Sequence, residues 1–168
     1  KRVLNPVTLI HAEEGSTVEL ELVQIMGVDD TKRDTQIDLA DRAKLIVTER
    51  LLTDFSQTAV SGIDIRIDGE DASAQVISRS VARGYSKQEF LFNLDGRSRC
   101  RGHIQCDAII MDNAVVISTP KISAFNEYAQ LVHEAAIGRL ESQQLLKLMS
   151  LGLSEKEAED TILKGFLK

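Results

Sequence analysis

The chain has 168 residues, of which 43% are hydrophobic and 27% are charged, and its formal net charge at pH 7 is −6. This length is enough for one domain with a hydrophobic core, either alone or with a small appendage. The acidic balance gives no support for binding to nucleic acid or to anionic membranes, and no apolar run reaches the roughly 20 residues that cross a bilayer, so we expect a cytoplasmic protein.

The cysteine and aromatic content indicates the redox compartment of the protein and the composition of its core. Cys100 and Cys106 are too few for a disulfide framework in a chain of this size, which favours reduced thiols in a reducing compartment. Aromatic residues make up only 4% of the chain and Trp is absent, so the core must consist mainly of aliphatic side chains. The chain starts at Lys1 without an initiator Met or an apolar leader, and we expect it to be a fragment or a processed chain.

Short segments of alternating apolar and polar residues run from Val7 to about Ser118. This period of two, with many Val, Ile, Thr and Leu residues, predicts β-strands. Residues 63–67 show the pattern well, since three isoleucines share one face and charged residues take the other. The charged residues at 29–33 are expected to form a solvent-exposed turn.

Aliphatic residues followed by acidic or Gly-rich turns recur along this region. Ile10, Leu39, Ile67 and Leu94 lie 29, 28 and 27 residues apart by subtraction of their positions. Imperfect repeats of this period indicate stacked units that bury their faces against one another, and we predict a β-solenoid. A β-sandwich is the alternative, because antiparallel hairpins also give short strands joined by Gly/Asp turns.

Two segments are ambiguous between strand and helix. Residues 38–52 contain good helix formers, but their place in the repeat favours a strand, and residues 124–138 fit both patterns. A helical signal is clear from Glu141 onward. It predicts one helix over Ser142–Leu151, ended by Gly152, and a second over Ser154–Leu167, started by a capping box of Ser154 and Glu157.

The C-terminal part of the chain, nearly half of its length, resembles a known family. QCDAII at residues 105–110, VHEAAIG at 132–138 and the helical sequence up to Phe166 look like the end of the SufB/SufD family, the scaffold of the SUF iron–sulfur cluster assembly machine. The resemblance covers about Leu91 to the C-terminus. It implies a right-handed parallel β-helix over residues 1–138, with residues 132–135 in a late strand, and a C-terminal helical region over residues 139–168.

The resemblance also implies candidate site residues. From residue type alone, Cys106 reads as an inert buried side chain, and His133 with Glu134 as a polar pair at a domain junction. The resemblance instead places Cys106 at the position linked to cluster assembly in the SufB branch, and His133 and Glu134 at further family positions. Thiolate, imidazole and carboxylate can together bind iron. In a continuous strand His133 and Glu134 point to opposite faces, so only one can share a pocket with Cys106 unless the backbone kinks.

The implied function is a scaffold on which nascent iron–sulfur clusters form before transfer to apo-proteins, with no catalytic turnover of its own. The implied partners are a SufC-type ABC ATPase, bound through the two C-terminal helices, and a second SufB/SufD-type subunit, identical or paralogous. Cys106 together with Glu134 favours the SufB branch. The tail lacks the further cysteines often found in that branch, which keeps a homodimeric SufBD protein open.

Three alternatives remain. One is a SufD-like partner that binds no cluster and only engages the ATPase. Another is a β-helix enzyme acting on polysaccharides through a strip formed by Asp64, Arg66, Asp68 and Glu70. The third is a zinc site at Cys100, His103 and Cys106, which lacks a fourth ligand and in a strand would have His103 opposite the thiols.

Overall fold

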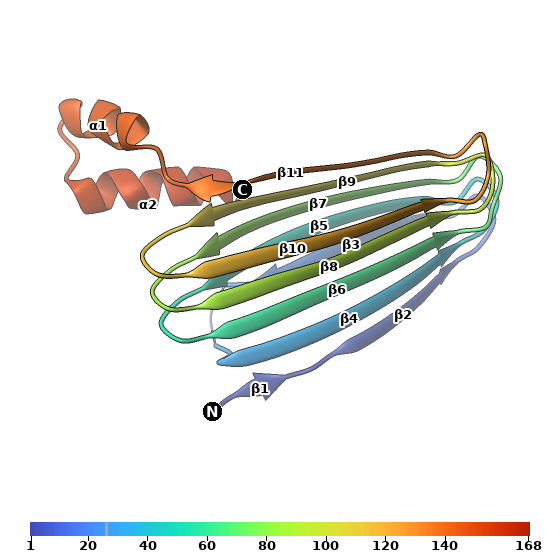
Figure 1. The fold of residues 1–168 in the computed structure, drawn as a ribbon, viewed down its shortest axis with the longest axis horizontal. Coiled ribbons are helices and arrows are strands. Elements are labelled where there is room, and N and C mark those ends of the chain that lie inside the picture. The colour runs from blue at the N-terminus through green and yellow to red at the C-terminus, as the bar shows by residue number, and fades with distance from the viewer. Residues whose placement is uncertain (26) are drawn as a thin grey trace.

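The computed structural model describes residues 1–25 and 27–168 of the chain (Figure 1). In this part the chain forms eleven strands followed by two helices, α1 (Ser142–Ser150) and α2 (Glu155–Phe166). The strands are β1 (Val3–Leu4), β2 (Val7–Ala12), β3 (Thr17–Gln24), β4 (Asp30–Leu39), β5 (Lys44–Thr53), β6 (Thr58–Ile67), β7 (Ser73–Ala82), β8 (Lys87–Gly96), β9 (Arg101–Ile110), β10 (Val115–Ala124) and β11 (Gln130–Arg139).

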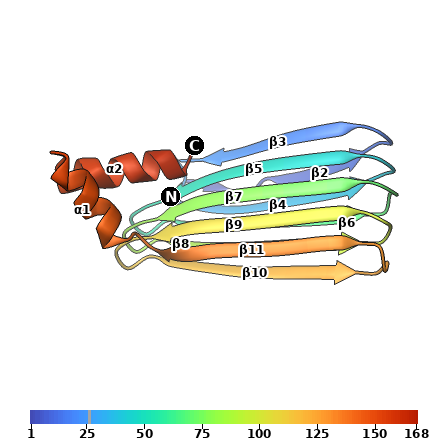
Figure 2. The same cartoon turned by 90° about the horizontal axis from the view of Figure 1, so that it is seen from above.

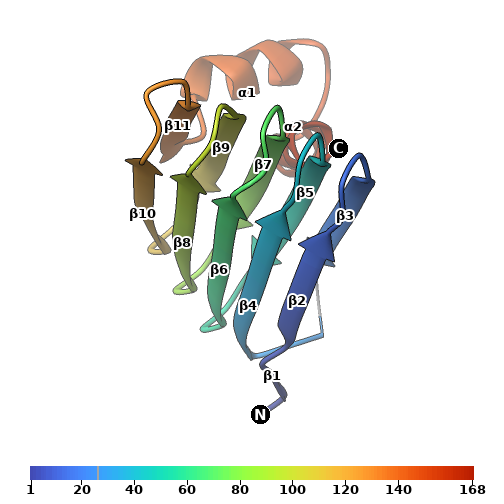
Figure 3. The same cartoon turned by 90° about the vertical axis from the view of Figure 1, so that its right-hand side faces the viewer.

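From β2 onward, successive strands alternate between two sheets. Sheet A has the order β1-β4-β6-β8-β10, with β2 also on β4, and sheet B has the order β11-β9-β7-β5-β3. Every strand pairing is parallel, and the two sheets face one another as flattened coils (Figure 3). The predicted β-solenoid is confirmed, and the antiparallel sandwich is wrong.

The space between the two sheets is filled by every second residue of each strand. Ile37, Ile65 and Leu94 are register partners in successive coils of sheet A, and each is at most 1% exposed. Their stacking buries an aliphatic column along the solenoid axis, which is the main source of stability in such repeats. The outward residues between them are polar, as the period of two predicts.

The repeat anchors read from the sequence are partly displaced. Leu39 and Ile67 are register partners, but Ile10 pairs with Ile37, and Leu94 pairs with Ile65. Each displacement is an even number of residues, so the same face of the strand remains buried.

Both ambiguous segments contain strands. Residues 38–52 contain most of β5, which pairs with β3 and β7, and residues 124–138 contain most of β11, which pairs with β9. The charged residues at 29–33 were expected to form a turn, and this prediction is wrong. Asp30 to Arg33 form the start of β4, and the Arg33 side chain is only 11% exposed.

The two helices lie beyond one end of the sheets, beside the end of β11 (Figure 2). The capping box is present, with the Ser154 backbone N–H donating to Glu157 Oε2 at 2.8 Å. The guanidinium of Arg50 on β5 donates to the carbonyl of Lys168 at 3.2 Å, which ties the end of the chain to sheet B. Neither helix of the described part is long and apolar enough to span a membrane.

Candidate functional site

Cys106 lies in the interior of the solenoid. It is on β9, where its register neighbours are Ser78 on β7 and Ala135 on β11, and it is 0% exposed. Since β11 is the last strand of sheet B, one coil covers Cys106 at this end.

The surroundings of Cys106 keep its thiol protonated. Burial raises the pKa of Cys106 to about 11, and the negative charges of Glu49 and Asp107 act in the same direction. The hydroxyls of Ser118 and Ser78 limit this rise in pKa. Because the thiolate is the form that binds metal or attacks sulfur, Cys106 must lose its proton and become accessible before it can react.

A buried ion pair lies next to this thiol. Glu49 on β5 is 0% exposed and accepts hydrogen bonds from the hydroxyls of Ser61 and Ser78, the latter at 2.6 Å. Arg33 on β4 donates to the same carboxylate at 3.1 Å. These bonds satisfy the charge inside the core, and Ser78 connects the pair to Cys106 through their shared register. Our reading of the sequence did not identify Arg33 or Glu49.

His133 and Glu134 lie on opposite faces of β11, as expected for a continuous strand. His133 points into the solenoid, on the side of Cys106, with Ile104 as its register partner. Partial burial lowers the pKa of His133, and its Nε2 has no hydrogen-bond partner in the described part of the chain. Glu134 points outward, so the structure brings His133 to the face of Cys106 and keeps Glu134 away from it.

Glu134 instead contacts a residue that we had considered only for zinc. Its Oε1 lies 2.6 Å from Nε2 of His103, which projects from the outer face of β9. His103 is therefore on the face opposite to Cys106, as expected for a strand, and this orientation counts against the zinc alternative. Across the described residues, no group of three or more His, Cys, Asp and Glu side chains is arranged to hold a metal ion.

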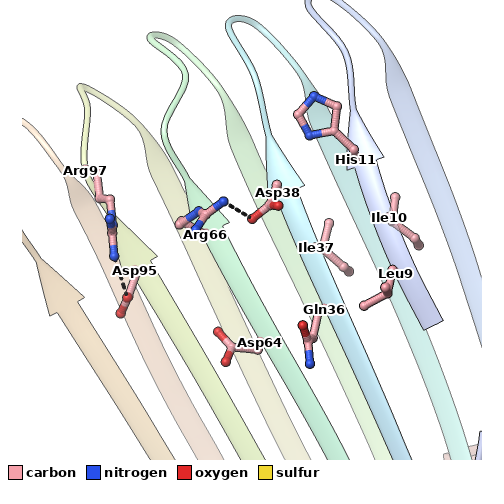
Figure 4. A pocket seen from close by; sticks show the side chains of 10 residues that line it. All are labelled: Leu9, Ile10, His11, Gln36, Ile37, Asp38, Asp64, Arg66, Asp95 and Arg97. Atoms are coloured by element: carbon pink, nitrogen blue, oxygen red, sulfur yellow. Dashed lines mark ion pairs between the residues drawn. The ribbon is translucent and has the colours of Figure 1, made fainter. Parts of the chain in front are cut away.

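The acidic strip considered for a polysaccharide enzyme lies on the outer face of sheet A. Asp64 and Arg66 line a pocket there, shown in Figure 4, whose lining residues include no Phe, Tyr or Trp side chain. Arg66 is bound by Asp38 at 3.0 Å and by Asp68 at 2.9 Å. Glu70 lies in the following turn beside Arg99. Paired acids without an aromatic platform give no support to sugar hydrolysis.

Comparison with known proteins gives a consistent result. A family model described as "SUF system FeS cluster assembly, SufBD core domain" matches residues 6–166. A protein from Methanocaldococcus jannaschii is 36% identical over 61% of this chain and 33% of its own length. A protein from Archaeoglobus fulgidus is 25% identical over 98% of this chain and 45% of its own length. A third, from Pyrococcus horikoshii, is 42% identical over 40% of this chain and 21% of its own length. All three are described as iron–sulfur cluster assembly SufBD family proteins, and the chain spans less than half the length of each.

Proposed function

The chain belongs to the SufBD family of iron–sulfur cluster assembly proteins, and from this membership we propose that it is a scaffold component on which nascent clusters form before they pass to apo-proteins. In this proposal the cluster is cargo, and the chain has no catalytic turnover of its own. Cys106 is the residue that receives sulfur or binds iron, and His133, two positions from the register partner of Cys106, is the candidate ligand on the same face of the sheet. Glu134, on the outer face of β11, is the third candidate ligand for iron.

The observation that carries the proposal is the position of Cys106 one coil below the end of the solenoid. A thiol at this depth is protected from oxidants in solution, which an exposed thiolate is not. Displacement of the last coil, formed by β10 and β11, brings the thiol within reach of iron and sulfur. The scaffold then reacts only when that coil moves.

The exposed surfaces support the two proposed partners. On α1, Leu146 is 63% exposed, and beyond its end Leu151 is 72% exposed, which suits a partner such as a SufC-type ATPase. Within the described strands, β10 and β11 are each paired on one side only, and they carry exposed apolar residues such as Ile117 and Val132. An open edge of this kind suits pairing with a second SufB/SufD-type subunit.

The test is anaerobic reconstitution with ferrous iron and sulfide, measured by visible absorption and iron content. Wild type is compared with Cys106→Ser and with Cys100→Ser, which removes the other buried thiol. We expect cluster absorption in wild type and in Cys100→Ser, and its loss in Cys106→Ser. A cluster that survives in Cys106→Ser contradicts the role of Cys106. No cluster in any of the three proteins favours the SufD-like role, in which the chain only engages the ATPase.

A further inference from the structure

We propose that His103 and Glu134 form a second, outward-facing site that holds a divalent transition-metal ion, with ferrous iron as the ion relevant to cluster assembly. The inference rests on the proposed scaffold function and adds a metal ligand, His103, to it. In this arrangement the metal ion is bound on the outer face of sheet B, and the Cys106 thiol lies on the inner face.

The first support is the geometry of the pair. Nε2 of His103 and Oε1 of Glu134 are 2.6 Å apart, although the two residues are not register partners. Glu134 is directly opposite Gln105, and His103 is directly opposite Val132. The carboxylate therefore reaches diagonally to the imidazole, while the Gln105 amide donates to Asp107 at 2.6 Å.

The second support is the chemistry of the two donors. An imidazole nitrogen and a carboxylate oxygen are both suitable ligands for ferrous iron. A metal bonded to each at about 2.1 Å, at a right angle, would hold the two atoms about 3 Å apart. The observed separation of 2.6 Å needs only a small side-chain adjustment to reach that distance.

The third support is the accessibility of the pair. The side chains of His103 and Glu134 are 36% and 59% exposed, so a metal ion can reach them without any opening of the solenoid. Only two ligands come from this chain, and the other coordination positions are left to water or to another molecule. A site with so few fixed ligands holds its ion weakly, which suits an ion that must be passed on to a growing cluster.

The surroundings of His103 differ from those of the other histidines. It has three histidines. His133 faces the interior, and His11 is exposed on β2, with no carboxylate hydrogen-bonded to it in the described part of the chain. His103 is the histidine that combines access to solvent with a carboxylate partner, and it lies on the last pair of strands of sheet B.

The first experiment is an anaerobic titration of the 168-residue chain with cobalt(II), followed by its visible absorption, and with ferrous iron, followed by equilibrium dialysis. We expect His103→Ala and Glu134→Gln each to weaken metal binding by about tenfold or more. His11→Ala is the matched control for an exposed histidine, and Cys100→Ser is the control for a buried thiol. Both controls should bind the metal as wild type does.

The second experiment locates the ion directly. Histidine ring signals are recorded by NMR while cobalt(II) is added, and we expect the His103 signals to broaden or shift first. Absence of metal binding, unchanged binding in His103→Ala, or a first effect at His133 or His11 each overturns the proposal. Cluster reconstitution that depends on Cys106 can still succeed in that case, so failure of this site is distinguishable from failure of the scaffold function.

Discussion

At the scale of single residues, the most consequential feature is the burial of Cys106. Its pKa is raised to about 11, chiefly by burial, so very little thiolate exists near pH 8. An unfolded cysteine with a pKa of about 8.5 has much more thiolate at that pH. We expect iodoacetamide to alkylate Cys106 at least about 100-fold more slowly in the folded chain than in the denatured chain at pH 8. Mass spectrometry of timed samples measures both rates.

The pH dependence of this reaction checks the cause. The pKa of Cys106 in the folded chain is above its unfolded value, so deprotonation favours the unfolded state, and the stability contributed by the protonated thiol decreases as pH rises from about 9 towards 11. The alkylation rate of folded Cys106 should increase over the same range. Fast alkylation of the folded chain at pH 8 would show that Cys106 is an accessible thiolate.

Phe55 has an unfavourable backbone conformation. It lies in the turn between β5 and β6 with a φ of 52°, and its side chain is 78% exposed, so little packing compensates for the conformation. Gly84 has a φ of 62° at the corresponding position of the next coil. We expect Phe55→Gly to raise the free energy of unfolding by about 0.5–1 kcal/mol, since glycine adopts this φ without steric cost.

Urea denaturation measures this change, with Phe55→Ala as the control. Alanine removes the same exposed ring but keeps a Cβ at positive φ, so it should leave the stability close to that of wild type. A Phe55→Gly protein that is less stable than Phe55→Ala would contradict the argument.

At the scale of elements, the Arg33–Glu49 pair joins β4 in sheet A to β5 in sheet B across the core. We expect Glu49→Ala to lower the free energy of unfolding by about 3–5 kcal/mol, because it leaves the largely buried Arg33 guanidinium and two serine hydroxyls without their acceptor. Urea denaturation again measures the change. Glu14→Ala, which removes the exposed ion pair with Arg42, is the control and should cost at most about 1 kcal/mol.

A double variant tests whether the loss of stability comes from leaving one buried charge without its partner. If Arg33→Leu is combined with Glu49→Leu, both buried charges are removed together, and much of the lost stability should return. A Glu49→Ala variant as stable as Glu14→Ala would show that the buried pair is hydrated rather than enclosed.

The same elements show how much of this structure the sequence could predict. Period-two alternation identified the buried faces of the strands around Ile37 and Ile65. The role of Cys106 was suggested by resemblance to the SufB/SufD family and stays a prediction. The exact register was not predictable, since a shift of two residues, as at Ile10, buries the same face. Arg33 was misread because charge was weighed above pattern. It continues the alternation of Thr31, Thr35 and Ile37, and this phase was the available signal.

The contact between His103 and Glu134 could not be predicted from the sequence, for a different reason. The residues are 31 positions apart and meet on a diagonal between neighbouring strands. Such a contact depends on the register of β9 with β11, which the repeat spacing alone does not fix. The opposite orientations of His133 and Glu134, in contrast, follow from strand geometry and were predictable.

At the scale of the whole molecule, stability should vary along the solenoid axis, because each coil contacts only its neighbours. None of the described residues of β10 or β11 is fully buried, whereas β8 buries every second residue. Equivalent amides in successive coils allow a matched comparison, since Lys87 N–H donates to Gln57 at 2.9 Å and Val115 N–H donates to Ser86 at 3.0 Å.

We expect the Val115 amide to exchange with deuterium at least about tenfold faster than the Lys87 amide after correction for intrinsic rates, because the last coil opens without unfolding its neighbours. Hydrogen exchange followed by NMR measures both rates. The Gln130 and Arg101 amides, which donate to the preceding coil at 2.9 and 3.1 Å, give the same comparison in sheet B. Equal protection at the paired positions would mean that the solenoid opens as one unit and that Cys106 is not uncovered by the last coil alone. If a second copy of the chain pairs with the open edge, the difference between Val115 and Lys87 should shrink as protein concentration rises.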